Sequence, residues 1–259
     1  MRIPFFRVNA FTTDRFGGNP AAVCLLEEWL PDSLMQRVAA ENNLSETAFL
    51  VPRNGYYDLR WMTPATEVDL CGHATLASAF VLFFEQGLAE DKIVFKTLSG
   101  LLSAVRHNGI LELDFPSRPA DKCDVPPLLV KALGHEPVEV RKARDYLLIF
   151  DSVAEVARLE PDMDMLGRLD SLGVIVTAAG QDLDFVSRFF APRVGVPEDP
   201  VTGSAHSSLI PYWSERLGKR ELLARQISKR GGDLYCRHLG DRVGIGGHCV
   251  IYCRGELDL

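Results

Sequence analysis

One pattern occurs twice in the 259-residue chain, and this internal repeat limits the possible folds more than any other sequence feature. In each copy a strand-like segment ends in a proline, a loop with an aspartate follows, and a glycine opens an apolar helix. The first copy links residues 60–64 to residues 69–74, and the second links residues 188–192 to residues 199–205. A chance match is the alternative. A true duplication predicts two similar lobes, each with strands wound around one central helix.

The first half of the chain reads as short strands and two helices. Strands are predicted at 3–9, 21–26, 47–51 and 57–61, and a helix at 33–42. A second helix is predicted from Gly72 to about Gln86, and its apolar residues on all sides indicate that it is enclosed. Residues 111–115 alternate between apolar and acidic side chains, and Asn108-Gly109 predicts the two-residue turn of a hairpin.

A proline-rich stretch divides the chain. Four prolines between residues 116 and 127 mark a linker, so we expect an N-terminal lobe at 1–118, with the C-terminal tail as a candidate addition, and a C-terminal lobe at 119–259. The second lobe again mixes both element types. Strands are predicted at 138–140, 146–150, 173–178, 185–190, 234–238, 243–245 and 249–252, and helical segments at 153–158, 163–169 and 203–217. This pattern indicates the α+β class.

Composition excludes several kinds of partner. There are 28 Lys and Arg against 35 Asp and Glu, a net charge of −7 without basic runs, which argues against nucleic-acid binding. No apolar run is long enough to span a membrane. The six cysteines are expected to be free thiols in a cytoplasmic protein. Because the chain lacks phosphate-binding glycine loops and the usual zinc-ligand spacings, we expect neither a nucleotide cofactor nor a metal.

The two helix starts are candidate anion sites. The first turn of a helix has unpaired N–H groups and a partial positive charge, which favour a carboxylate. Gly72 and Gly203 allow a ligand to approach the backbone closely, and Thr202 and Ser204 add hydroxyl groups. If the lobes face each other, both starts converge on one cleft. The alternative is that both are ordinary helix caps.

Three residues are candidates for acid–base chemistry. Glu46, within Ser45-Glu46-Thr47, stands at the mouth of an apolar strand, where burial raises a carboxyl pKa and suits a general base. His73 lies one residue into the central helix, where we expect much of its ring to stay uncovered and able to move a proton. Asp199 precedes the second helix. The alternatives are a solvated loop glutamate, a capping histidine and an aspartate that complements the helix dipole.

Cys71 is the most interesting thiol. It directly precedes a helix start, a position that lowers a thiol pKa. Two facing thiols can remove a proton from one face of a carbon and return one to the other. Because the repeat places Thr202 opposite Cys71, a racemase with two thiols is disfavoured.

Several motifs together resemble one known family. Residues 11–12 and 18–23, 43–49, 71–75, 198–206, 226–232 and 243–247 are similar, in order, to the PhzF-like isomerases of phenazine biosynthesis. The resemblance implies a diaminopimelate epimerase-like fold with two pseudo-symmetric lobes, no cofactor, no metal and often a homodimer. The founding activity of that family is isomerisation of a dihydro-hydroxyanthranilate by relocation of a proton.

The resemblance also implies roles for individual residues. Glu46 matches the proton-transferring carboxylate, and His73 and Asp199 match supporting polar residues. The groups expected to hold the substrate carboxylate and its surroundings are Ser45, Gly72, Thr202, Gly203 and Ser204. Residues 121–173 carry no recognised motif, so the substrate identity does not transfer.

These observations predict a cofactor-independent isomerase that relocates a proton on a small carboxylate. Two alternatives stay open. One is an epimerase or racemase that depends on Cys71. The other is a catalytically inactive member of the fold that binds a ligand or a protein.

Overall fold

Two groups of strands, each built around a buried helix, make up the part of the chain that the computed structural model describes, residues 1–107 and 109–259. The first unit comprises Met1–Asp114 and Gly246–Leu259, and the second comprises Phe115–Ile245. The chain leaves the first unit within β8 (Ile110–Pro116) and returns to it at the end of β17 (Arg242–Gly247).

The strands of the first unit pair in the order β18–β1–β2–β3–β4–β6–β7–β8, in which the β2–β3 and β4–β6 pairs are parallel. A short strand, β5 (Glu67–Val68), also pairs with β4, and α1 (Asp32–Asn42) connects β2 to β3. The other strands are β1 (Arg2–Ala10), β2 (Asn19–Leu25), β3 (Glu46–Arg53), β4 (Tyr56–Met62), β6 (Lys92–Thr97), β7 (Gly100–His107) and β18 (Cys249–Asp258).

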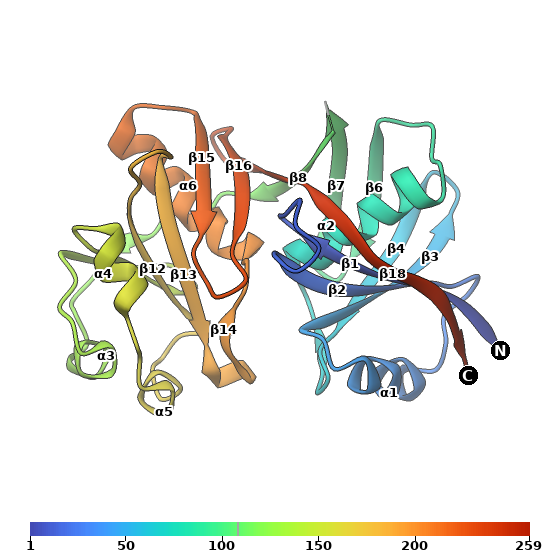
Figure 1. Cartoon of the computed structure of the whole chain (residues 1–259), viewed down its shortest axis with the longest axis horizontal. Coiled ribbons are helices and arrows are strands. Elements are labelled where there is room, and N and C mark those ends of the chain that lie inside the picture. The colour runs from blue at the N-terminus through green and yellow to red at the C-terminus, as the bar shows by residue number, and fades with distance from the viewer. Residues whose placement is uncertain (108) are drawn as a thin grey trace. The chain divides into compact units, whose positions relative to one another are not determined.

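The central helix of the first unit is α2 (Gly72–Phe80), continued by the π-helical turn η1 (Val81–Glu85). All residues from Gly72 to Ala79 are buried, so the predicted enclosure of this helix is confirmed. It packs against β1, β2, β3 and β18 (Figure 1). Many of its side chains are small, which lets the strands approach closely. The buried hydroxyls of Thr75 and Ser78 donate to carbonyls one turn earlier, so their polar groups are satisfied.

Both ends of the chain belong to the first unit. Strand β18 pairs antiparallel with β1 from Arg2 opposite Asp258 to Ala10 opposite Cys249. The amino group of Met1 also bonds the carbonyl of Leu259. The last strand therefore completes a sheet that the first strand begins (Figure 1).

The second unit pairs its strands in the order β9–β10–β11–β12–β13–β15–β16, in which β11–β12 and β13–β15 are parallel. These strands are β9 (Asp121–Lys122), β10 (Glu139–Lys142), β11 (Tyr146–Ile149), β12 (Val174–Ala179), β13 (Phe185–Ala191), β15 (Glu221–Gln226) and β16 (Gly232–His238). Strand β14 (Val196–Asp199) follows the short turn η2 (Pro192–Val194) and pairs with β13. Three short helices supply apolar side chains to a core over this sheet: α3 (Pro127–Leu133), α4 (Val153–Arg158) and α5 (Met163–Leu166).

The central helix of the second unit is α6 (Gly203–Leu217). Pro211 interrupts its hydrogen bonding, because proline has no N–H to donate to the carbonyl of Ser207. That carbonyl instead accepts from the N–H of Arg118 at 2.8 Å. The freed backbone group thus ties α6 to the segment that follows β8.

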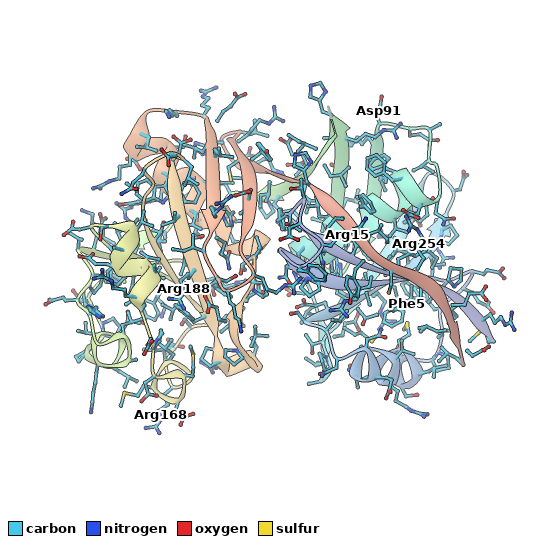
Figure 2. The ribbon with its side chains drawn as sticks, in the orientation of Figure 1. Phe5, Arg15, Asp91, Arg168, Arg188 and Arg254 are labelled. Carbon is cyan, nitrogen blue, oxygen red and sulfur yellow. The ribbon has the colours of Figure 1, made fainter. Side chains whose placement is uncertain are left out.

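The pairing pattern of the two units is the same, and this confirms the prediction of two similar lobes. From β1 to β7, and again from β10 to β16, the pairs run antiparallel, parallel, antiparallel, parallel, antiparallel. The first residue of each sequence repeat is an arginine that forms a bidentate ion pair with a glutamate of the next short strand, β5 or β14. Arg60 binds Glu67 at 2.7 and 2.6 Å, and Arg188 binds Glu198 at 2.7 and 3.1 Å (Arg188 is labelled in Figure 2).

These two ion pairs correct the register of the repeat. Glu67 precedes Gly72 by as many residues as Glu198 precedes Gly203. Asp199 therefore corresponds to Val68. The aspartate of the first copy, Asp69, does not correspond to Asp199. Thr202 still corresponds to Cys71.

Other sequence-based predictions have mixed outcomes. The hairpin is confirmed by the pairing of His107 with Ile110, while Asn108 of the predicted turn lies outside the described residues. The sequence patterns gave no prediction for β5, β6, β9, β14, β15 and α3. All six cysteines are free thiols. Within residues 1–107 and 109–259, no helix is long and apolar enough to cross a membrane.

Candidate active site

A carboxylate and an imidazole meet at the start of α2. Helix α1 is followed by its C-cap residue Asn43, which has a left-handed φ of 47° and donates its N–H to the carbonyl of Ala39. The chain then enters β3 at Glu46. His73 is the second residue of α2, and its Nε2 lies 3.0 Å from Oε2 of Glu46. The side chains are 15% exposed for Glu46 and 5% for His73, so the expectation that much of the His73 ring stays uncovered is wrong.

The environment of this pair favours proton transfer. Oε2 of Glu46 and Nε2 of His73 are buried, and their relative orientation leaves each without an aligned hydrogen-bond partner among the described residues. Burial lowers the pKa of His73, whereas negative charge on Cys71 and on Glu46 raises it, and the net direction is upward. The charge of Glu46 acts from the Nε2 side of the ring. Two groups of this kind can hold a proton and pass it on.

The opposite nitrogen of the ring, Nδ1, faces two further side chains. Nδ2 of Asn19 lies 3.1 Å away and Sγ of Cys71 lies 3.6 Å away. Asn19 is fully buried at the start of β2. It follows Gly18, which has a φ of +64°, a conformation that favours glycine. A Cβ at this position would also clash with Ala10 and Thr12. The sequence motif contained Asn19, but no sequence signal assigned it a role.

The predicted activation of Cys71 is wrong. Burial, followed by the nearby Glu46 charge, raises the pKa of Cys71 to about 11. The thiol is enclosed before α2, and the loss of hydration outweighs the helix start. Cys71 is therefore protonated at neutral pH and is a poor nucleophile or base.

The donor atoms of Glu46, Cys71 and His73 lie within 4.8 Å of one another. Their placement does not suit one metal ion. Glu46 faces Nε2 of the ring and Cys71 faces Nδ1, so an ion at bonding distances of about 2.0–2.3 Å from one nitrogen cannot also reach the ligand at the other. These residues fit a hydrogen-bonded acid–base group better than a metal centre.

The predicted residues of the second unit gather around a buried glutamine. Oδ2 of Asp199, at the end of β14, accepts from the Thr202 hydroxyl at 2.6 Å. Gln226 of β15 is fully buried; its Oε1 accepts from the Thr202 N–H at 2.8 Å. Its Nε2 donates to the Asp199 carbonyl at 2.7 Å and to the Thr202 hydroxyl at 3.2 Å. Asp199 and Gln226 thus hold the Thr202 hydroxyl at the N-cap of α6.

Both central helices begin without a side-chain cap. Cys71 and Thr202 occupy the N-cap positions of α2 and α6, and neither side chain caps its helix. Gly72 and Gly203 are buried, so their helix starts have limited access to water. Ser204, the second residue of α6, accepts from Nη2 of Arg144 at 3.2 Å. Ser45 is half-buried and directly precedes Glu46.

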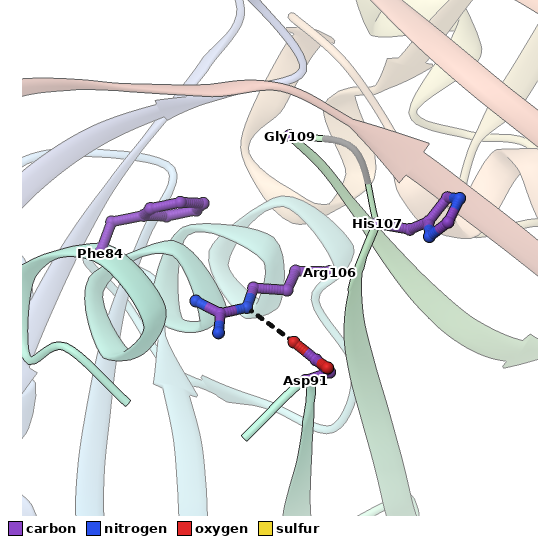
Figure 3. A pocket seen from close by; sticks show the side chains of 5 residues that line it. All are labelled: Phe84, Asp91, Arg106, His107 and Gly109. Atoms are coloured by element: carbon purple, nitrogen blue, oxygen red, sulfur yellow. Dashed lines mark hydrogen bonds and ion pairs between the residues drawn. The ribbon is translucent and has the colours of Figure 1, made fainter. Parts of the chain in front are cut away.

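A surface pocket of about 370 Å³ lies elsewhere in the first unit (Figure 3). It is lined by Phe84, Asp91, Arg106, His107 and Gly109, and an ion pair of 3.1 Å joins Arg106 to Asp91. None of the predicted site residues lines it. We therefore place the candidate chemistry at the helix starts and not in this pocket.

Comparison with solved structures first defines the class. The fold is that of the diaminopimelate epimerase-like proteins. A probable proline racemase from Agrobacterium radiobacter superposes with a TM-score of 0.67 over 99% of this chain and 93% of its own, at 11% identity. At that identity the likeness concerns the fold alone.

The chain belongs to the PhzC/PhzF family of phenazine biosynthesis-like proteins, whose family model matches residues 8–255. An uncharacterized isomerase of Pseudomonas aeruginosa is 51% identical over the full length of both chains. A human phenazine biosynthesis-like domain-containing protein is 42% identical over 99% of both. The crystal structure of a PhzF family protein from Enterococcus faecalis has a TM-score of 0.98 at 46% identity, covering 100% of both chains. The protein is an enzyme of the isomerase type.

Proposed function

We propose that this protein relocates a proton on a small carboxylate-bearing substrate, with Glu46 as the general acid and base. The observation that carries the proposal is the 3.0 Å approach of Glu46 Oε2 to His73 Nε2, with both atoms buried and without an aligned partner within residues 1–107 and 109–259. A reacting group of the substrate would supply the missing partner.

The chemistry needs only these side chains and the substrate. Glu46 takes a proton from one carbon, the electron pair left behind shifts along the conjugated substrate, and Glu46 returns the proton to a second carbon. Atoms and charge balance, and the product is an isomer. His73, beside the carboxylate, stabilises the charged form of Glu46 and accepts or donates a hydrogen bond at the substrate. General acid–base catalysis of this kind contributes about 10²–10⁴-fold.

The uncapped helix starts support a carboxylate as the substrate anchor. The backbone N–H groups at the helix starts, at Gly72 and at Gly203, favour an anion, and Ser204 adds a hydroxyl whose acceptor side is used by Arg144. Negative charge that develops during the reaction is stabilised by the same amides. Asp199 suits a cationic or hydroxyl group of the substrate. We predict that one substrate molecule contacts both helix starts, Ser45 and Thr202. The homodimer and the cytoplasmic location also stay predictions.

The alternative of an epimerase that uses Cys71 has less support. The thiol is protonated at neutral pH, and the matching residue is Thr202, whose hydroxyl is a much weaker acid than a thiol. No specific observation favours the alternative of an inactive binding protein.

The test combines a ligand screen with matched variants. Small amino and hydroxy carboxylates are screened by thermal shift, since a ligand at 100 times its dissociation constant adds about 2.7 kcal/mol of stability. Each ligand found is incubated with the enzyme in D₂O, and isomerisation is followed by proton NMR. Glu46→Gln should slow turnover about 10²–10⁴-fold while ligand affinity changes little.

The control is Glu41→Gln, which makes the same substitution at an exposed position of α1. It should leave turnover unchanged. Full activity in Glu46→Gln would refute the assignment of Glu46.

A further inference from the structure

Asn19 and Arg144 occupy equivalent positions in the two halves of the chain. Strand β2 pairs with its parallel neighbour from Ala21 onward, and β11 pairs with its parallel neighbour from Tyr146 onward. Asn19 stands two residues before the first of these positions, and Arg144 stands two residues before the second.

Both side chains bind the same position of their central helix. Asn19 Nδ2 lies 3.1 Å from Nδ1 of His73, the second residue of α2. Arg144 Nη2 donates at 3.2 Å to Oγ of Ser204, the second residue of α6. The contact is thus built twice, and with different chemistry each time.

The difference follows from what each partner needs. Ser204 keeps its proton, so a guanidinium, which only donates, suits it. Beside the Glu46 carboxylate, the neutral ring of His73 keeps its hydrogen on Nε2, so its Nδ1 accepts. The protonated ring has hydrogens on both nitrogens, so its Nδ1 donates. A carboxamide serves both forms, because a half-turn exchanges its N–H₂ for its oxygen at the same place.

The remaining groups around His73 do not replace this function. Glu46, from β3, faces the other ring nitrogen. Cys71, before α2, faces Nδ1 at 3.6 Å, and its protonated thiol is a weak hydrogen-bonding group. Asn19 is the fully buried amide at this place, and it follows the tight turn at Gly18.

We propose that Asn19 is a positioning residue that holds the His73 ring in both of its protonation states by turning its amide. The proposal rests on the proposed function in that it assumes His73 gains and loses a proton during turnover. It adds a residue to which the family resemblance gave no role.

The test measures His73 directly and needs no substrate. The Cε1–H signals of the six histidines are followed by NMR against pH, and the signal of His73 is identified by its loss in His73→Gln. Asn19→Asp offers only acceptors and a negative charge, so the pKa of His73 should rise by about 1–3 units. Asn19→Leu offers neither donor nor acceptor. The pKa should then fall, because the charged ring loses the stronger hydrogen bond.

Opposite shifts in the two variants support the proposal, since a purely structural disturbance does not reverse with the chemistry of the substituent. If Asn19→Asp does not fold, a fall in Asn19→Leu carries the same conclusion. An unchanged pKa, or a shift in the same direction in both variants, overturns it. Asn54→Asp, an equal charge change at an exposed position of the first unit, is the control and should leave His73 unmoved.

The two proposals fail separately. If Asn19 variants leave the pKa of His73 unchanged while Glu46→Gln slows turnover about 10²–10⁴-fold, the function stands and the role of Asn19 falls. If the pKa shifts as expected while Glu46→Gln stays fully active, the role of Asn19 stands and the assigned chemistry falls.

Discussion

Acid should destabilise this protein through His206, a histidine of α6. The ring is fully buried, its Nδ1–H donates to the Thr202 carbonyl at 2.8 Å, and its Nε2 has no hydrogen-bond partner among the described residues. Burial lowers its pKa from 6.5 to about 4. Between these values the unfolded chain binds a proton that the folded chain excludes, so the free energy of unfolding falls as the pH falls.

The size of the effect follows from the shift. At 1.36 kcal/mol per pKa unit, the complete loss below pH 4 is about 3 kcal/mol, and about 2 kcal/mol is lost between pH 7.5 and pH 5. His73 acts in the opposite sense. Its raised pKa gives stability that is present below the unfolded pKa and is lost as the pH rises through the folded value. The pH dependence of His206→Asn is therefore compared with that of the unmodified protein. The contributions of His73 and of the carboxyl groups cancel in this difference.

Urea denaturation at pH 7.5, 6.5, 5.5 and 5 measures the effect. His206→Asn places an amide N–H where Nδ1–H donates, and it removes the titration. The loss of stability on acidification should therefore be about 2 kcal/mol smaller in this variant than in the unmodified protein. His135→Asn, at an exposed site, should keep the original pH dependence. Equal pH dependence in His206→Asn and the unmodified protein would refute the reasoning.

Two further predictions concern the helix starts. Cys71→Ser should keep most of the turnover that depends on Glu46, because the thiol is protonated; near-complete loss in the D₂O assay would instead favour epimerisation through Cys71. Gln226→Leu should lower the free energy of unfolding by about 1–3 kcal/mol, because it leaves the buried Thr202 N–H without a partner. Urea denaturation at pH 7.5 checks this value, and a loss below about 1 kcal/mol would contradict the role of Gln226.

Much of the fold was predictable because its strongest signals are local and repeated. The all-round apolar pattern after Gly72 predicted an enclosed helix, and the duplicated strand–proline–glycine pattern predicted two similar lobes. The pairing of β14 and β15 was missed because Glu198, Asp199 and the alternating residues of β15 give a weak apolar signal. Their order depends on Arg188 and on pairing with β13, which are interactions distant in sequence.

The candidate site was predictable only in part. Spacing and motif placed Glu46 and His73 at element boundaries, where the structure brings them to 3.0 Å. The state of Cys71 was predicted with the wrong sign, because a helix start lowers a thiol pKa only where the sulfur keeps some hydration. Gln226 and Asn19 were missed as site residues since a buried amide has no periodicity or spacing of its own. Their partners become visible only when the strands are paired.

The pairing of β18 with β1 has a consequence for how the protein is made. The first unit lacks its closing strand until residues 249–258 leave the ribosome, whereas the second unit is one continuous segment. At synthesis rates of about 5–20 residues per second, β1 waits on the order of 10–50 s for its partner. The second unit should therefore fold first, and the first unit should be the part that needs a chaperone in the meantime.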